Sequence, residues 1–100
     1  MRIIAESTLK KYYQKHPETE TGIKVWLQKV KKASWKQPAD ITKDFNHARP
    51  IGNGRVIFHI NKNDYRLIVQ VNYDLGQVFI CFIGTHSEYD NIEPMTVWDY

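Results

Sequence analysis

The chain has 100 residues, of which 42% are hydrophobic and 25% charged, and its formal net charge at pH 7 is +3. This composition excludes a disordered chain and predicts one folded domain covering residues 1–100. The single cysteine excludes an internal disulfide framework, and no stretch approaches the roughly 20 apolar residues of a membrane span. Residues 1–5 are too short an apolar run for a secretory signal, so we expect a cytoplasmic protein without a membrane partner.

The charges are unevenly distributed along the chain. Residues 1–50 hold eleven Lys and Arg and five Asp and Glu, whereas residues 51–100 hold three and six. A basic half suits a polyanion such as RNA, but lysine-rich helix faces in contact with water produce the same imbalance. Charge alone therefore leaves both interpretations open.

The first third of the chain predicts a short strand and two helices. The strand is assigned to residues 1–5. Apolar and aromatic side chains then recur at helical spacing over about 6–16 and about 18–32, and a proline separates the two segments. Trp26 and Leu27 lie on the apolar stripe of the second helix, so we expect both to be buried.

Residues 33–54 predict a connection without regular structure, because prolines and glycines punctuate them. We expect its three large apolar side chains to pack onto the core: Trp35, Ile41 and Phe45. Three strands follow, over 55–61, 65–73 and 78–83, and polar turn residues separate them.

Alternation along the first two of these strands assigns their side chains to two faces. One apolar set should face the helices: Val56, Phe58, Ile60, Leu67, Val69 and Val71. The opposite face then carries His59, Arg66, Gln70 and Asn72. Cys81 lies in a continuously apolar strand, so the pattern leaves its orientation open, and a buried thiol is favoured over a nucleophile.

Residues 85–90 predict a short C-terminal helix. Thr85 and Glu88 match a capping box, so the helix should begin at His86, where free N–H groups would favour an anion. Pairing across the 74–77 turn brings Arg66 and His86 to the same end of the sheet.

The resulting order is β-α-α-β-β-β plus a short C-terminal helix. It predicts an α+β fold in which the two N-terminal helices pack on one face of a small mixed, mostly antiparallel sheet. The other face should remain partly open, with its polar side chains accessible.

The sequence lacks known zinc-ligand spacings, a phosphate-binding glycine loop and a dinucleotide fingerprint, so neither a metal nor a cofactor is expected. His, Arg and Tyr around an open sheet face suit metal-free RNA cleavage, in which histidine transfers protons and arginine stabilises the phosphate charge. Structural roles compete: His59 as a strand residue, Arg66 as an ion-pair partner of Asp64 or Asp74, and His86 as a helix-start residue. His16 and His47 receive no functional role.

Four segments carry motifs in a fixed order. They are WKQPADI at residues 35–41 with Phe45, RVIFHI at 55–60, YRLI at 65–68 and GTHSEYD at 84–90. Together they resemble the HigB family of toxin–antitoxin toxins, within the wider RelE-like fold. The resemblance implies a metal-independent, ribosome-dependent mRNA endoribonuclease. Its partners would be mRNA on the ribosome and a helix-turn-helix antitoxin of the HigA type, with operator DNA contacted only through the antitoxin.

The resemblance also assigns site residues. Arg66 matches a basic position of the family and would stabilise the phosphate charge, His86 would act as general acid or base, and Tyr89 would stack on a nucleotide. Arg55 and His59 are weaker candidates, and five lysines would hold RNA: Lys29, Lys31, Lys32, Lys36 and Lys43.

Two positions depart from the family pattern. His59 replaces an asparagine, and Cys81 replaces an arginine or lysine. The missing cation leaves two alternatives open: a non-catalytic RNA- or ribosome-binding module that blocks translation, and an interaction protein whose cleft only receives an antitoxin segment.

Overall fold

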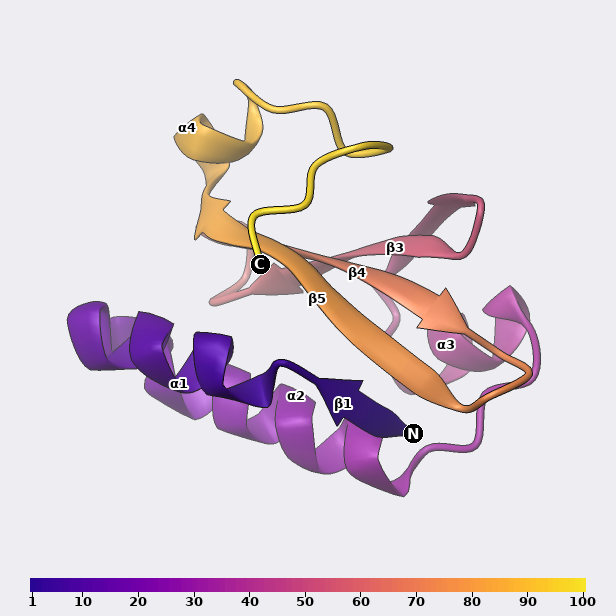
Figure 1. Cartoon of the computed structure of the whole chain (residues 1–100). Helices are drawn as coiled ribbons and strands as arrows, with labels where there is room; N and C mark the ends of the chain where they lie inside the picture. Colours follow the sequence, from indigo (N-terminus) through magenta and orange to yellow (C-terminus); the bar gives the residue numbers. More distant parts are fainter.

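The computed structural model describes residues 1–100 and confirms the α+β class (Figure 1). Its elements are β1 (Arg2–Ile4), α1 (Glu6–Lys15), the 3-10 turn η1 (Pro17–Thr19), α2 (Glu20–Lys32), α3 (Pro38–Asp44), β2 (Arg49–Gly52), β3 (Arg55–Ile60), β4 (Tyr65–Asn72), β5 (Gln77–Thr85) and α4 (His86–Tyr89). None of the helices is long and apolar enough to cross a membrane.

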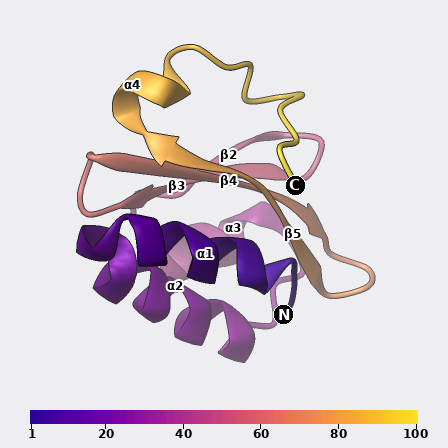
Figure 2. The ribbon, with the colours of Figure 1, turned by 60° about the vertical axis from the view of Figure 1, so that its left-hand side comes forward.

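The five strands form one sheet in the order β1-β5-β4-β3-β2. β1 runs parallel to β5, and the other neighbouring strands are antiparallel, as expected for a mixed, mostly antiparallel sheet. Helices α1 and α2 lie side by side on one face of the sheet, and α4 with the C-terminal segment lies on the other (Figure 2). The predicted placement of the two N-terminal helices is therefore confirmed.

The helix-covered face contains the main core, a cluster of 18 buried residues. Trp26 and Leu27 are both buried, as predicted, and the apolar sets of β3 and β4 belong to the same cluster. The Trp26 ring meets the Phe58 ring edge-on, with centroids 5.4 Å apart. Burial of these large side chains supplies most of the driving force for folding.

The connection at 33–54 contains two elements that the sequence prediction missed, α3 and β2. Pro38 opens α3, and the Gln37–Asp40 capping box fixes its start, although seven residues are too few for a clear period. The edge strand β2 has four residues, one of them Pro50. The three apolar side chains pack onto the core as expected: Trp35, Ile41 and Phe45.

The face away from the helices is less open than predicted. Ile57, Ile68, Cys81 and Phe82 form a second buried cluster there, and the C-terminal segment covers it with Ile92, Val97 and Tyr89. Asp99 also donates its backbone N–H to the Cys81 carbonyl at 2.8 Å. The expectation of an open face was wrong for this part of the sheet, because the terminal segment has no periodic pattern that would reveal its packing.

A β-bulge sets the orientation of Cys81. Ile68 pairs with Phe82 and Val69 pairs with Ile80, so Cys81 is the extra residue between them. The thiol lies on the face away from the helices but is completely buried, and burial raises its pKa. The interpretation of Cys81 as a buried, unreactive residue fits this environment.

Candidate catalytic site

A row of polar side chains crosses the face away from the helices at one end of the sheet. His59 on β3 pairs with Arg66 on β4, and Arg66 pairs with Gly84 on β5. Neighbouring strands are about 4.8 Å apart, so the imidazole and the guanidinium lie side by side. Helix α4 continues from β5 and brings the Tyr89 ring over Arg66, with 5.5 Å from Cζ to the ring centroid.

Arg66 is 8% exposed, and its Nη1 donates to the Asn63 carbonyl at 2.8 Å. No carboxylate forms an ion pair with it, so the expected alternative of pairing with Asp64 or Asp74 is not realised. A guanidinium has five N–H donors, and this one makes a single hydrogen bond. A buried cation with spare donors is suited to bind an anion that enters the site.

Helix α4 begins at His86 with the predicted capping box. Glu88 donates its N–H to Thr85 Oγ1 at 3.1 Å, and Thr85 donates its N–H to Glu88 Oε1 at 2.8 Å. His86 donates its own N–H to the Asp64 carbonyl. The backbone donors of Thr85, His86 and Glu88 are therefore satisfied within the chain, so these three are not free for an anion, contrary to expectation.

The His86 side chain lies at the end of the row, as predicted, but it does not contact Arg66 directly. Its ring meets the Tyr89 ring, with centroids 6.4 Å apart, and its Nδ1 is 3.3 Å from Asp90 Oδ2. Tyr89 therefore connects Arg66 to His86. The predicted pairing across the turn was close: Arg66 pairs with Gly84, one residue nearer His86 than it would be without the bulge at Cys81.

His59 is half-buried beside Arg66 and has a second neighbour that the sequence analysis set aside. The rings of His47 and His59 are nearly parallel, with an interplanar angle of 9° and centroids 6.2 Å apart. The pKa of His59 is lowered mainly by burial, and nearby positive groups add to this effect: Arg66, His47, Arg49 and His86. These surroundings favour the neutral imidazole.

The turn around Asn53 is the feature of the sequence that could have predicted that His47 lies near His59. Gly52 and Gly54 both have positive φ, which the β2–β3 turn requires. A hairpin centred there brings the segment before Arg49, which contains His47, alongside His59. This relation was missed because no strand was predicted before the turn.

The two histidines border a hollow of about 460 Å³ between α2, α3 and the β3–β4 turn. Lys29, Lys43 and Lys62 line it, together with one carboxylate, Asp44. Lys29 donates to the Asp44 carbonyl oxygen at 2.9 Å and lies 4.6 Å from the Phe45 ring centroid. The hollow is therefore cationic overall and partly aromatic, as suits a phosphate chain with attached bases.

The other proposed RNA-binding lysines do not join this hollow. Lys31 is ion-paired with Glu6, with 2.9 Å between Nζ and the carboxylate, while Lys32 and Lys36 are exposed. The ion pair with α1 gives Lys31 a structural role. The five lysines thus form at least two groups rather than one continuous surface.

Arg55, the remaining catalytic candidate, lies at the far end of β3. Its Nη1 donates to the carbonyls of Pro94 and Val97 at 3.1 and 2.7 Å, and its Nε donates to Gln70. Trp98 covers the guanidinium at 5.3 Å. Arg55 holds the C-terminal segment and stands about 14 Å along the strand from His59.

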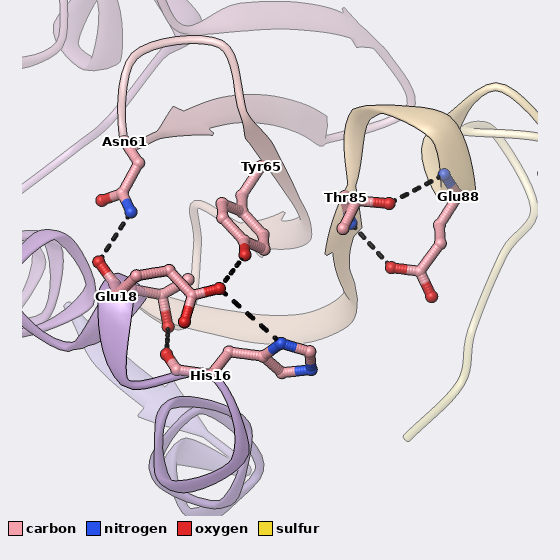
Figure 3. A network of polar contacts seen from close by, with 7 residues as sticks. His16, Glu18, Asn61, Tyr65, Thr85 and Glu88 are labelled. Carbon is pink, nitrogen blue, oxygen red and sulfur yellow. Dashed lines mark hydrogen bonds and ion pairs between the residues drawn. The ribbon is translucent and has the colours of Figure 1, made fainter.

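A polar network on the helix side supports the end of the sheet that carries the row (Figure 3). Asn61 donates to the Glu18 carbonyl at 2.7 Å, and the Tyr65 hydroxyl donates to the Glu18 carboxylate. That hydrogen bond, together with burial, raises the pKa of Tyr65 to about 12. Since Tyr65 pairs with Thr85, the network ties the helix layer to the strands that bear Arg66 and α4.

A family model described as HigB_toxin, the RelE-like toxic component of a toxin–antitoxin system, matches residues 19–92. The match includes all the elements from α2 to α4, and so all the residues of the row. No individual curated protein matches the chain.

Proposed function

The chain belongs to the HigB family of RelE-like toxins, the toxic components of toxin–antitoxin systems, and from this we propose that it is an mRNA endoribonuclease that cleaves message on the ribosome. The proposal rests on one observation above all: the buried Arg66 guanidinium has donors to spare and no acidic partner. Such a group stabilises the negative charge that develops on a phosphate during cleavage.

The chemistry requires no metal in this proposal. A base removes the proton from a ribose 2′-hydroxyl, the resulting oxygen attacks the adjacent phosphate, and an acid protonates the leaving 5′ oxygen. Arg66 stabilises the phosphate charge, and histidine of the row transfers the protons, with His59 and His86 as the sequence-based candidates. Tyr89 covers Arg66 and stacks on a nucleotide.

The exposed lysines hold the phosphate backbone of mRNA or ribosomal RNA in this proposal. Lys29 and Lys43, at the hollow beside His59, are the best placed of the five. An antitoxin of the HigA type neutralises the toxin, and operator DNA is reached only through that antitoxin.

The second candidate is a module that blocks translation by occupying the ribosome without cleaving message. Burial of Cys81 favours it, because this strand contributes no second cation to the row. Arg66 is then the only buried guanidinium near His59, and one charge stabilises a phosphorane less than two.

The decisive experiment maps mRNA 5′ ends after induction of the wild type, Arg66→Ala and the matched control Arg2→Ala. Arg2 is an exposed arginine on the edge strand β1, away from the row. We expect new 5′ ends for the wild type and the control but not for Arg66→Ala. Arrested translation with intact message in the wild type would replace the endoribonuclease with the occupancy mechanism.

A further inference from the structure

His47, which stacks beside His59, is the strongest feature that the proposed function does not use. Neither imidazole makes a hydrogen bond or an ion pair within the chain, although His59 is half-buried. Both rings line the same recess, together with Lys62 and Asn63 of the β3–β4 turn. Two unpartnered imidazoles that face one cationic recess are available to a ligand rather than committed to the fold.

Strand pairing and the turn before β2 hold the two histidines in this arrangement. Arg49 pairs with Ile57 on the antiparallel β2–β3 ladder. His47 lies in the turn that precedes Arg49, and its ring stacks beside that of His59. The β3–β4 ladder puts Arg66 on the other side of His59. The order of groups across these three segments is therefore imidazole, imidazole and guanidinium, and the two imidazole centroids are 6.2 Å apart.

Cleavage of RNA by its own 2′-hydroxyl needs two proton-transfer groups, since the entering and leaving oxygens lie on opposite sides of the phosphorus. His59 stands next to the charge stabiliser and is kept neutral by its surroundings, which suits a base. His86 is a poor match for the second role because it lies beyond Arg66 and next to the Asp90 carboxylate. His47 directly faces His59 and is open to water.

We propose that His47 is a catalytic residue of the ribonuclease reaction and forms the acid–base pair with His59, the substrate phosphate lying in the recess that both rings line, beside Arg66. This inference rests on the proposed ribonuclease activity. It changes the role of His86 from proton transfer to contact with the RNA.

The step balances without a further reactant. His59 takes the proton of the 2′-hydroxyl, a bond forms between O2′ and phosphorus, and the bond between phosphorus and O5′ breaks. Protonated His47 gives its proton to O5′. The products are a 2′,3′-cyclic phosphate and a 5′-hydroxyl, and the two imidazoles return to their starting states by proton exchange with water.

Charged groups on every neighbouring element set the pH response of the pair. Those around His59 are Arg66, Arg49, His86, His47 and Lys62, and those around His47 are Lys43, Lys62, Lys29, Asp44 and His59. Cations dominate both sets. Together with burial, they favour the neutral form of His59.

The test measures single-turnover cleavage of mRNA on programmed ribosomes from pH 5 to pH 9. The wild type is compared with His47→Gln, His59→Gln, His86→Gln and the control His16→Gln. His16 is a histidine on the helix side that stacks on Tyr12, outside the row. We expect a bell-shaped profile for the wild type and for His16→Gln.

His47→Gln should cleave about 10²–10⁴-fold more slowly and lose the fall in rate at high pH. His59→Gln should instead lose the fall at low pH, and the double variant should lose less than the product of the two single effects. The melting temperature of His47→Gln should stay within about 4 °C of the wild type, because the residue is exposed.

A substrate with sulfur in place of the bridging 5′ oxygen isolates the acid role, since a thiolate leaves without receiving a proton. His47→Gln should cleave it nearly as fast as the wild type, whereas His59→Gln should remain slow. If the wild type cleaves message but His47→Gln cleaves at the wild-type rate and keeps both limbs of the pH–rate profile, the inference is overturned while the proposed function stands. It is overturned equally if His86→Gln, and not His47→Gln, removes the high-pH limb. A wild type that cleaves no message overturns both proposals.

Discussion

Two buried arginines on the same face of the sheet show how position decides what a guanidinium does. Arg55 is 5% exposed and Arg66 is 8% exposed, so burial does not distinguish them. Arg55 donates to Gln70 and to two carbonyls of the C-terminal segment, whereas Arg66 donates to one carbonyl of a turn. The first guanidinium makes three hydrogen bonds within the fold and the second makes one, so Arg66 keeps more donors for a ligand.

The two ends of this face therefore differ in role: one stabilises the fold, and the other carries the candidate site. At the Arg55 end, the terminal segment closes over an apolar cluster and excludes solvent. At the Arg66 end, the Tyr89 ring and His59 lie against the cation, and the lysine-lined hollow lies alongside. Donors without a partner, rather than buried charge as such, mark the candidate site.

The largest expected effect comes from adding a third arginine between these ends. Cys81→Arg would put a charge under the terminal segment among Ile57, Ile68 and Phe82, with no carboxylate to pair with it. We expect it to cost about 3–5 kcal/mol and to unfold much of the protein at growth temperature. Urea unfolding checks this, with Cys81→Ala as the control. A folded Cys81→Arg variant with faster cleavage would mean that the segment opens readily.

Arg66→Met should give the next largest effect, on rate rather than stability. The methionine retains much of the apolar stem but removes every donor. We expect single-turnover cleavage to fall about 10²–10³-fold. The free energy of unfolding, measured with urea, should change by much less than the fall in rate corresponds to as a free energy of activation. Equal losses in both quantities would contradict the distinction between the two arginines.

Arg55→Met should show the converse behaviour. It leaves the Pro94 and Val97 carbonyls without their charged donor, and each such bond is worth about 1.5–3 kcal/mol before water replaces it. We expect a loss of about 2–3 kcal/mol in urea unfolding and faster hydrogen exchange at Asp99. The cleavage rate per folded molecule, measured at low temperature, should stay within about threefold of the wild type.

Tyr89→Leu should have the smallest effect and tests the ring over Arg66. Loss of a cation–π contact of about 1 kcal/mol, together with loss of base stacking, should slow cleavage by roughly tenfold. Tyr89→Phe keeps the ring face and should stay within about twofold of the wild type. A large loss in Tyr89→Phe would instead assign a role to the hydroxyl.

The elements that the sequence predicted are those with a long hydrophobic period. α1, α2 and the strands β3 to β5 repeat their apolar residues over enough positions to reveal both type and face. α3 and β2 have seven and four residues, too few for such a signal. Because β2 was missed, the partner of His59 was missed with it.

The roles of the two arginines could not be separated from sequence, because the groups that occupy Arg55 are backbone carbonyls. Any residue supplies a carbonyl, so Pro94 and Val97 give no sign of this function in the sequence. The terminal segment that carries them lacks a repeat as well. Arg66, Tyr89 and the capping box at Thr85 were identified because their motif is made of side chains.

The parallel pairing of β1 with β5 has a consequence for the order in which the protein is made. Ile3 pairs with Val78, so β1 can join the sheet only after a strand about 75 positions later in the chain has been synthesised. The groups of the row are spread from His47 to Tyr89 and meet only through β5 and α4. Contacts of such long sequence separation form slowly. A nascent chain therefore has no complete row until β5 and α4 have been synthesised and have paired with β4.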